Sequence, residues 1–242
     1  MRNYATNQQI GLRRNQCDAT AVFTDRRTGA RAYVLLDGIG DTNTVREWTR
    51  DAAVRLARAA ARRGDAELGL RAVYDGYVAQ GGGRASAVAV VAVTAPGKPL
   101  TVAWCGDSRA YLLIDGTAQR LTNDHNLRRL YTGGSRNTVT SWLGSAFTED
   151  EVKERCEGEH PAIESVTRPA STVRLLLASD GAYEPHEDAQ KNLGDLLTGT
   201  PGEVARRLTT TAVQQSITAT RTQRRPEGYA DNATVLVADL NA

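Results

Sequence analysis

Short apolar runs rich in valine, leucine and alanine recur along the chain and predict β-strands. These runs cover residues 19–24, 31–36, 86–93, 100–104, 109–114, 173–178 and 234–240. A polar turn at 25–29 makes the first two a hairpin, and the turns at 95–98 and 115–116 predict a β-meander for the next three. Residues 123–166 are polar and weakly periodic, and we expect short helices and loops there.

Apolar residues at helical spacing predict three main helices. The first follows the hairpin, with a capping-box pattern of Thr44 and Glu47 at its start and Gly64 at its end. A second helix is expected over 65–80, and a long one that starts after Pro201-Gly202 and runs to about Thr220. Because strands and helices are grouped rather than alternating, the pattern favours antiparallel sheets covered by helices over a doubly wound parallel sheet. The expected fold class is therefore α+β.

The chain has 242 residues and the composition of an ordinary globular protein, without a biased linker, so we expect a single domain over residues 1–242. A net charge of +2 gives no reason to expect nucleic acid or an anionic membrane as a partner, although a basic loop at 221–227 precedes the last strand. The apolar runs are too short for a membrane span, and the first residues lack the apolar core of a secretion signal. We therefore expect a cytoplasmic protein.

Aspartates stand next to glycine or asparagine in four segments where strands are expected to begin or end. The pairs are Asp37-Gly38, Gly106-Asp107, Asp180-Gly181 and Asp231-Asn232. One Asp-Gly pair alone is an ordinary turn signal. Carboxylates delivered from several strand ends, without a Cys/His ligand pattern, suit hard divalent cations. The pattern therefore indicates a metal-dependent hydrolase.

In their order along the chain, these segments resemble the motifs of the metal-dependent serine/threonine protein phosphatases, the type-2C family. The matching segments are Arg13 with Asp18, Asp37-Gly38, Gly106-Asp107-Ser108-Arg109-Ala110, Leu121-Thr122-Asn123-Asp124-His125, Thr140-Ser141-Trp142-Leu143-Gly144, Ser179-Asp180-Gly181 and Asp231-Asn232-Ala233-Thr234. The resemblance implies a central β-sandwich of two antiparallel sheets flanked by helices on both sides, an α-β-β-α arrangement. It also implies hydrolysis of phosphoserine and phosphothreonine in phosphorylated proteins, in a pathway with a Ser/Thr kinase, and leaves the oligomeric state open.

The resemblance further implies two Mg²⁺ or Mn²⁺ ions that bridge a nucleophilic water, and leaves open whether a third ion is used. Asp37 would lie between the two ions, and the Gly38 carbonyl would complete one coordination shell. Asp180 and Asp231 would bind the other ion, and Asp18 would act through metal-bound water.

Three further residues receive roles from the same resemblance. Arg13 would bind the substrate phosphate with its planar guanidinium, with Arg14 as the alternative. Asn232 would orient its neighbour. Asp107 would either hold a third ion together with Asp180 or shape the turn between two strands.

The chain departs from the family pattern at a few positions. Cys17 stands in place of an acidic residue, Ile39 in place of a histidine proposed to protonate the leaving group, Asp41 in place of a glycine, and Glu184 in place of an aspartate. The three principal ligands Asp37, Asp180 and Asp231 are all kept. This favours an active enzyme over a phosphatase-like regulatory or binding module that has lost catalysis, and over a two-metal nuclease, which would show a basic groove.

Other polar and aromatic residues receive structural interpretations. Asp124 and His125 are expected to fix a turn, and His160 and His186 to be solvated. The three tryptophans and the three cysteines are expected in the core, since the cysteine spacing fits neither a zinc site nor a disulfide scaffold. These residues are Trp48, Trp104, Trp142, Cys17, Cys105 and Cys156.

Overall fold

Two antiparallel five-stranded sheets form the centre of the part of the chain that the structure describes. The structure is a computed structural model, and it describes residues 3–169 and 172–240. The first sheet has the order β1-β10-β9-β6-β7 and the second the order β2-β3-β4-β5-β8. The strands are β1 (Tyr4–Gln9), β2 (Ala19–Thr24), β3 (Arg31–Gly38), β4 (Ala87–Thr94), β5 (Leu100–Cys105), β6 (Arg109–Ile114), β7 (Thr117–Arg120), β8 (Glu164–Arg168), β9 (Val173–Ala178) and β10 (Ala233–Leu240).

The chain crosses from one sheet to the other in the turn between β5 and β6. β4 pairs with β5 in the second sheet, with Val90 opposite Trp104. β6 instead pairs with β7 and β9 in the first sheet. The predicted meander is therefore wrong for its third strand. A turn signal marks where the chain reverses, but it does not say whether the reversal stays within a sheet or spans the sandwich.

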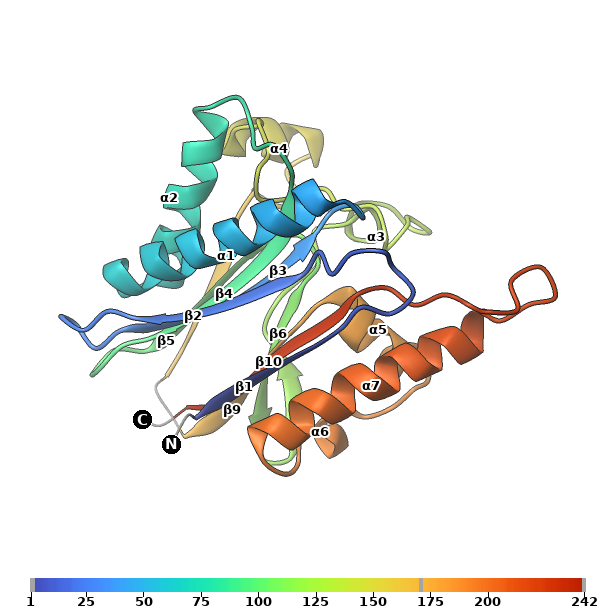
Figure 1. Cartoon of the computed structure of the whole chain (residues 1–242). Coiled ribbons are helices and arrows are strands. Elements are labelled where there is room, and N and C mark those ends of the chain that lie inside the picture. The colour runs from blue at the N-terminus through green and yellow to red at the C-terminus, as the bar shows by residue number, and fades with distance from the viewer. Residues whose placement is uncertain (1–2, 170–171, 241–242) are drawn as a thin grey trace.

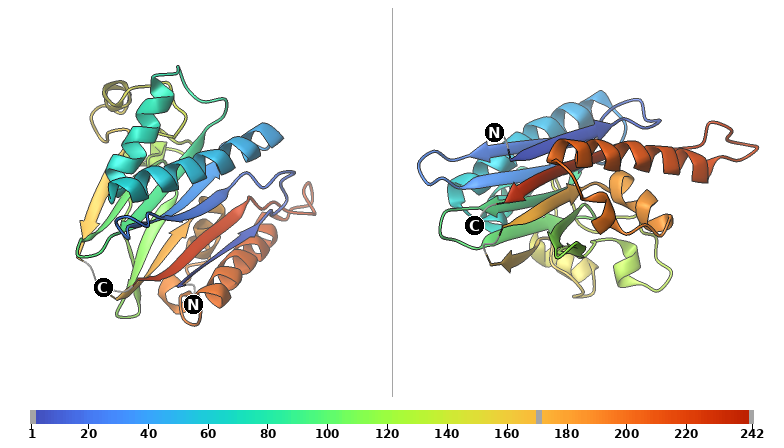
Figure 2. Two further views of the ribbon diagram at one scale, coloured as in Figure 1. Left: turned by 60° about the vertical axis from the view of Figure 1, so that its left-hand side comes forward. Right: turned by 90° about the horizontal axis from the view of Figure 1, so that it is seen from below.

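Helices cover the outer faces of both sheets (Figures 1 and 2). α1 and α2 pack on the second sheet, whereas α5, α6 and α7 pack on the first. The helices are α1 (Asn43–Arg63), α2 (Ala66–Val78), α3 (Leu127–Leu130), α4 (Glu149–Arg155), α5 (Asp180–Asp188), α6 (Leu193–Leu196) and α7 (Pro201–Thr220). None of the helices that the structure describes is long and apolar enough to cross a membrane.

The start of α1 differs from the capping box predicted at Thr44. The cap is Thr42, which has extended backbone and whose side chain accepts a hydrogen bond from the Val45 N–H at 3.3 Å. The prediction at Thr44 and Glu47 is therefore wrong, because the chain leaves the turn after β3 already positioned to begin the helix earlier. Gly64 ends α1 with φ of 62°, as predicted.

Three apolar layers hold the fold together. Leu35, Leu175 and Leu236 belong to the layer between the two sheets. Leu56 belongs to the layer under α1 and α2, and Leu208 to the layer under α7. Each fully buried leucine contributes roughly 1.5–3 kcal/mol of transfer free energy. The layers confirm the expected α+β sandwich with helices on both sides.

The elements that the apolar pattern did not reveal are β1, β7, β8, α5 and α6. β1 has the polar sequence YATNQQ and pairs at the sheet edge with β10, where Tyr4 lies opposite Ala238. Its strand conformation comes from this pairing, because β-propensity depends strongly on the neighbouring strand. α5 begins at Asp180, directly after β9, and contains Pro185.

Candidate active site

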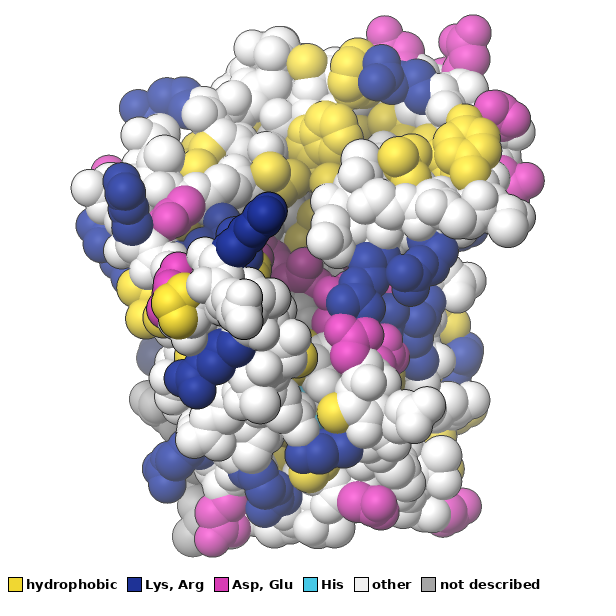
Figure 3. All heavy atoms as spheres, turned by 90° about the vertical axis from the view of Figure 1, so that its right-hand side faces the viewer, with side chains coloured by type: hydrophobic (Ala, Val, Ile, Leu, Met, Phe, Trp, Pro, Cys, Tyr) yellow, Lys and Arg dark blue, Asp and Glu magenta, His cyan; other side chains and the backbone are white. Residues whose placement is uncertain are grey.

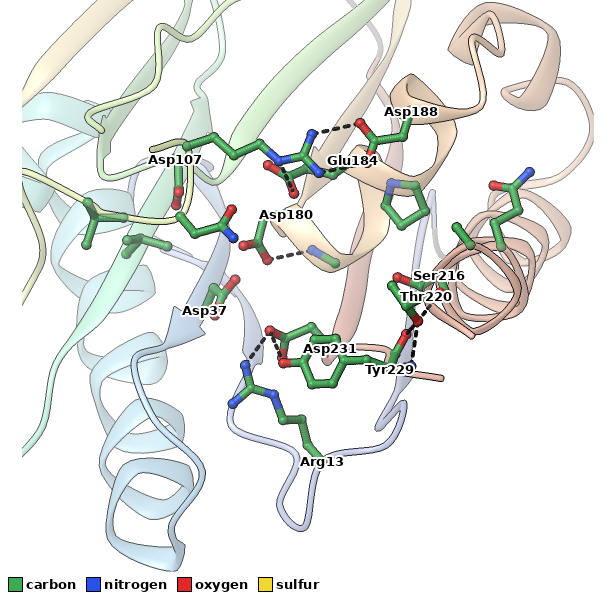
Figure 4. A pocket seen from close by; sticks show the side chains of 18 of the residues that line it. Arg13, Asp37, Asp107, Asp180, Glu184, Asp188, Ser216, Thr220, Tyr229 and Asp231 are labelled. Carbon is green, nitrogen blue, oxygen red and sulfur yellow. Dashed lines mark hydrogen bonds and ion pairs between the residues drawn. The ribbon is translucent and has the colours of Figure 1, made fainter. Parts of the chain in front are cut away.

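One end of the sandwich carries a cleft of about 560 Å³, and its lining includes four of the aspartates and the arginine that the sequence motifs singled out (Figure 4). These residues are Asp37, Asp107, Asp180, Asp231 and Arg13. Figure 3 shows this face of the molecule, with acidic side chains in the central hollow and basic side chains around it. The structure thus brings together residues that lie up to 218 positions apart in the sequence.

Asp18 and Asp37 are neighbours because β2 and β3 pair antiparallel from the residue after Asp18 to the residue before Asp37. Asp37 faces the cleft, whereas Asp18 is only 2% exposed. Gly38 packs tightly against the preceding segment, since a Cβ there would lie about 2.5 Å from the Cys17 carbonyl oxygen. The sequence pattern assigned this glycine to close approach of an ion, but chain packing already requires it.

Asp180 and Asp231 meet at the paired ends of β9 and β10. The Ser179 N–H donates to the Thr234 carbonyl at 3.0 Å, which places the two strand ends side by side. A Cβ on Gly181 would collide with the carbonyl oxygen of the residue after Asp231. Glycine therefore permits the close approach that sets the two carboxylates on one wall of the cleft.

The segment before β2 is tied to the end of β10 by Asn232 and Arg13. Asn232 Oδ1 accepts a hydrogen bond from the Cys17 N–H at 2.7 Å, and its Nδ2 donates to the Ile10 carbonyl at 2.9 Å. Arg13 Nη2 forms an ion pair with Asp231 Oδ2. These contacts hold Arg13 in the cleft wall, next to a carboxylate with a predicted metal-binding role.

Asp107 stands in the turn that crosses between the sheets, and it is 5% exposed. Gly106 has φ of 101°, and a Cβ there would collide with Val88, so the turn requires glycine. The His125 N–H donates to the Gly106 carbonyl at 3.0 Å, and the Tyr183 hydroxyl donates to the Asp107 carbonyl at 2.9 Å. The turn is therefore fixed from two directions.

The clustered carboxyl groups destabilise one another's charge. Burial, followed by the nearby aspartates, raises the pKa of Asp18 to about 7. The pKa values of Asp37, Asp107 and Asp180 are raised for the same reasons, burial first. Burial and the neighbouring Asp180 carboxylate raise the pKa of Glu184 to about 7. A cation bound among these oxygens would offset both the cost of burying the carboxylates and the repulsion between them.

The donor set suits a hard divalent cation, because it consists of carboxylates and backbone oxygens. Asp18 Oδ2 is buried without a hydrogen-bond partner, so it has free acceptor capacity. Among residues 3–169 and 172–240, however, no three His, Cys, Asp or Glu side chains are placed so that they hold one ion as they stand. Asp231 Oδ2 is engaged by Arg13 and by the Tyr229 hydroxyl, the latter at 3.1 Å. Shared coordination therefore requires some carboxylates to turn.

A second charged cluster lies beside the cleft around Arg109. Its guanidinium binds both Asp124 carboxylate oxygens, at 2.9 and 2.7 Å, and Glu187 at 2.5 Å. It also lies over the Tyr183 ring, 3.8 Å from the centroid. Burial opposes the charge of Arg109, but these partners outweigh it and raise the arginine pKa. These contacts agree with the structural role predicted for Asp124.

The histidines are buried, so the prediction that His160 and His186 are solvated is wrong. The His160 ring stacks on His125 with 4.2 Å between centroids, and its Nε2 lies 2.9 Å from the Thr140 hydroxyl. His186 Nε2 donates to the Leu208 carbonyl at 3.0 Å. Burial lowers all three histidine pKa values, that of His125 to about 4. Their neighbours in sequence are polar, but a neutral imidazole costs much less to bury than a charged one, even though His186 Nδ1 has no hydrogen-bond partner among the described residues.

Sequence reasoning gave no role to two residues of the cleft, Arg136 and Tyr229. Arg136 forms ion pairs with Glu184 at 3.1 Å and with Asp188 at 2.7 Å. Its surroundings in sequence show only a loop, so no signal pointed to it. Tyr229 lies two residues before Asp231, and this closeness to a recognised motif was an available hint.

The sequence matches the family model of protein phosphatase 2C over residues 45–130. This stretch includes Asp107, whereas the other clustered aspartates lie outside it. No curated protein matches the sequence.

Several solved structures of bacterial serine/threonine phosphatases have the same fold. The Mycobacterium tuberculosis serine/threonine phosphatase PstP/Ppp is 23% identical, with 99% of this chain and 98% of that chain covered and a TM-score of 0.68. The S. agalactiae serine/threonine phosphatase is 19% identical, with 98% of this chain and 99% of that chain covered and a TM-score of 0.73. The PPM Ser-Thr phosphatase MsPP from Mycobacterium smegmatis, in complex with cacodylate, is 23% identical, with 98% of each chain covered and a TM-score of 0.66. At these identities the matches establish the fold, and together with the family match they confirm the resemblance to protein phosphatase 2C.

Proposed function

We propose that this chain is a metal-dependent serine/threonine protein phosphatase that hydrolyses phosphoserine and phosphothreonine in proteins. The observation that carries the proposal is the convergence of Asp37, Asp180 and Asp231, from three strand ends, on one cleft. The match to protein phosphatase 2C supports the same reaction.

Two Mg²⁺ or Mn²⁺ ions are the proposed cofactors. Asp37, the Gly38 carbonyl, Asp180 and Asp231 would hold them, and Asp18 would act through a water. When bound, such a pair of ions supplies a water of lowered pKa as the nucleophile and positive charge for the phosphoryl oxygens. The protein contributes the fixed strand ends that set these oxygens around one space.

Arg13 would bind the phosphate of the substrate. It already lies in the cleft wall beside Asp231, with a side chain that is 29% exposed, so a planar guanidinium is available to a phosphate. Its ion pair with Asp231 would keep it in place between turnovers. The M. smegmatis phosphatase is in complex with cacodylate, an oxyanion, and this agrees with anion binding by a protein of the same fold.

For Asp107 we propose a third, weaker ion shared with Asp180. Both carboxyl groups line the cleft, and burial together with Asp180 raises the pKa of Asp107, as expected for two acids that lie close together. In this case Asp107→Ala keeps two tight ions and its melting temperature but loses most turnover. A purely structural role predicts lower stability with nearly normal turnover per folded molecule, and metal stoichiometry measured with kcat separates the two outcomes.

The decisive experiment is phosphate release from a phosphothreonine peptide. Turnover should require Mn²⁺ or Mg²⁺, disappear with excess chelator, and return when the metal is added back. Full activity in excess chelator would contradict the proposal. A phosphatase-like binding module, the alternative, predicts no release under any metal condition although the peptide still binds.

The biological setting is proposed on the same basis. We infer phosphorylated proteins as substrates, a Ser/Thr kinase as the opposing activity, and the cytoplasm as the location. We also propose that residues 1–242 form one catalytic domain.

A further inference from the structure

A basic loop between α7 and β10 stands at the mouth of the cleft. In Figures 1 and 2 it projects beyond the end of α7, away from the body of the molecule. Residues 221–227 are all exposed, and they include Arg221, Arg224 and Arg225 against one acidic residue, Glu227. In the described part of the chain, none of these three arginines forms an ion pair. Their charge is therefore available to a partner.

The base of the loop is part of the cleft wall. Thr220, the last residue of α7, and Tyr229, the first side chain after the loop, both line the cleft. The Tyr229 N–H donates to Thr220 Oγ1 at 2.6 Å, which closes the base of the loop. Gly228 has φ of 75°, and a Cβ there would collide with the Ile217 carbonyl. The loop is thus fastened to α7 at the point where the cleft opens.

The loop also has internal order. Thr222 and Arg225 exchange two backbone hydrogen bonds of 3.1 Å each, and the Arg225 N–H also lies 3.0 Å from Thr222 Oγ1. The Arg225 guanidinium lies over the Tyr229 ring, 5.6 Å from its centroid, while Arg13 lies over the same ring at 5.5 Å. Tyr229 therefore separates a cleft arginine from a loop arginine, and basic charge continues from the cleft wall onto the loop.

We propose that this loop is a docking element for phosphoprotein substrates that carry acidic residues next to the phosphorylated serine or threonine. The inference rests on the proposed function, and it specifies the substrate class. A phosphoresidue in the cleft places its flanking residues at the mouth, and charge complementarity with three unpaired arginines favours aspartate and glutamate there. Exposed ion pairs are individually weak, so the effect should be modest for one arginine and additive over the three.

The test compares phosphothreonine peptides of equal length in the presence of Mn²⁺. One peptide carries three acidic residues on the N-terminal side of the phosphothreonine, and a second carries them on its C-terminal side. In the remaining peptides, neutral or basic residues replace the acidic ones. We expect kcat/KM for one acidic peptide to exceed that for the neutral peptide by about tenfold at low salt. The ratio should shrink at about 300 mM salt, where screening is strong.

Two variants with the same change of charge locate the effect. In the loop variant, Arg221, Arg224 and Arg225 are replaced by glutamine, and the ratio should fall to about one. In the control variant, Arg58, Arg62 and Arg63 are replaced by glutamine at the far end of α1, where all three are exposed, and the ratio should stay as in the wild type. Because each ratio is taken within one preparation, partial unfolding cancels.

Three outcomes would overturn the docking role: a wild type without preference, a loop variant that keeps it, or equal loss in both variants. Tighter binding of an oligouridylate of equal charge through the same arginines would also overturn it. If the wild type releases no phosphate from any peptide or from p-nitrophenyl phosphate, the proposed function fails instead. Anisotropy of a fluorescent acidic peptide, measured with both variants, then still decides whether the loop binds it.

Discussion

Two groups of charged side chains lie side by side at one end of the sandwich. They differ in whether the buried charges are matched by charges of opposite sign. In and beside the cleft, burial together with neighbouring carboxylates raises the pKa values of Asp18, Asp37 and Asp180. In the adjacent cluster, Arg109 is matched to Asp124 and Glu187. Among residues 3–169 and 172–240, none of these three carboxyl groups forms an ion pair, whereas the charges of the Arg109 cluster are matched.

This difference in charge matching distinguishes a site that needs a ligand from a network of ion pairs that stabilises the fold. Folding alone does not favour several buried carboxylates in one place, because each is penalised by desolvation and by the others. Their arrangement is explained if a cation completes it. The Arg109 cluster needs no such completion, although it comes from motifs of the same family resemblance. Substitutions in the two groups should therefore have different effects.

The largest effect is expected for the cleft. Asp180→Asn and Asp231→Asn should each lower kcat by about a thousandfold or more at saturating metal, because a lost ligand charge weakens the ion that provides the nucleophile. The metal-free variants should melt at the wild-type temperature or slightly above it, since one repulsion is removed. Asp195→Asn, an exposed aspartate outside the cleft, is the control. Near-normal kcat in either cleft variant would show that the ligand assignment is wrong.

The Arg109 cluster should respond in stability. Arg109→Met leaves Asp124 with only the longer ion pair to Arg120, at 3.5 Å, and breaking a buried pair in this way lowers the free energy of unfolding by about 3–5 kcal/mol. Urea unfolding measures this loss. The exposed Arg58→Met change provides the control and should leave stability nearly unaltered. A loss below about 1 kcal/mol for Arg109→Met would mean that the cluster does not stabilise the fold.

Arg13 belongs to the cleft but carries the opposite charge. Arg13→Ala should lower kcat/KM by the equivalent of about 2–4 kcal/mol, on the scale of charged hydrogen bonds, while two metal ions still bind. Arg14→Ala is the matched control, because Arg14 is adjacent and exposed. If the Arg14 variant shows the loss and the Arg13 variant does not, the phosphate-binding role belongs to the neighbouring residue.

The smallest expected effect is on the pH dependence of the stability of the metal-free protein. The pKa of Asp18 is raised by burial to about 7, so its contribution to stability is present at low pH and is lost as pH rises from about 4 through 7. Between pH 5.5 and 7.5 this amounts to about 2 kcal/mol. The buried histidines act in the opposite direction, because their lowered pKa values favour folding at higher pH.

The histidine contribution is removed by comparison with Asp18→Asn in chelator. The wild type should lose about 2 kcal/mol more than the variant between pH 5.5 and 7.5, as measured by urea unfolding at each pH. Equal pH dependence in the two proteins would contradict the raised pKa of Asp18.

Local sequence signals located most of the fold. The apolar runs of β3, β4, β9 and β10 are nearly continuous, so the strands were predicted within a few residues. They did not reveal β1, because a polar edge strand is held by pairing with β10 rather than by its own side chains. They also did not reveal that β6 leaves β5 for the other sheet, because partner choice depends on the closed sandwich.

The sequence by itself determined the chemistry of the candidate site: aspartates at strand ends, in a recognisable order, with glycine or asparagine beside them. Only the tertiary structure decided which other residues surround these aspartates. It turned Arg13 onto Asp231, placed Tyr229 between Arg13 and the basic loop, and buried His160 and His186. The physical reason is that side-chain chemistry and strand periodicity are local properties of the chain. Burial and charge pairing arise between segments that meet only when the two sheets pack.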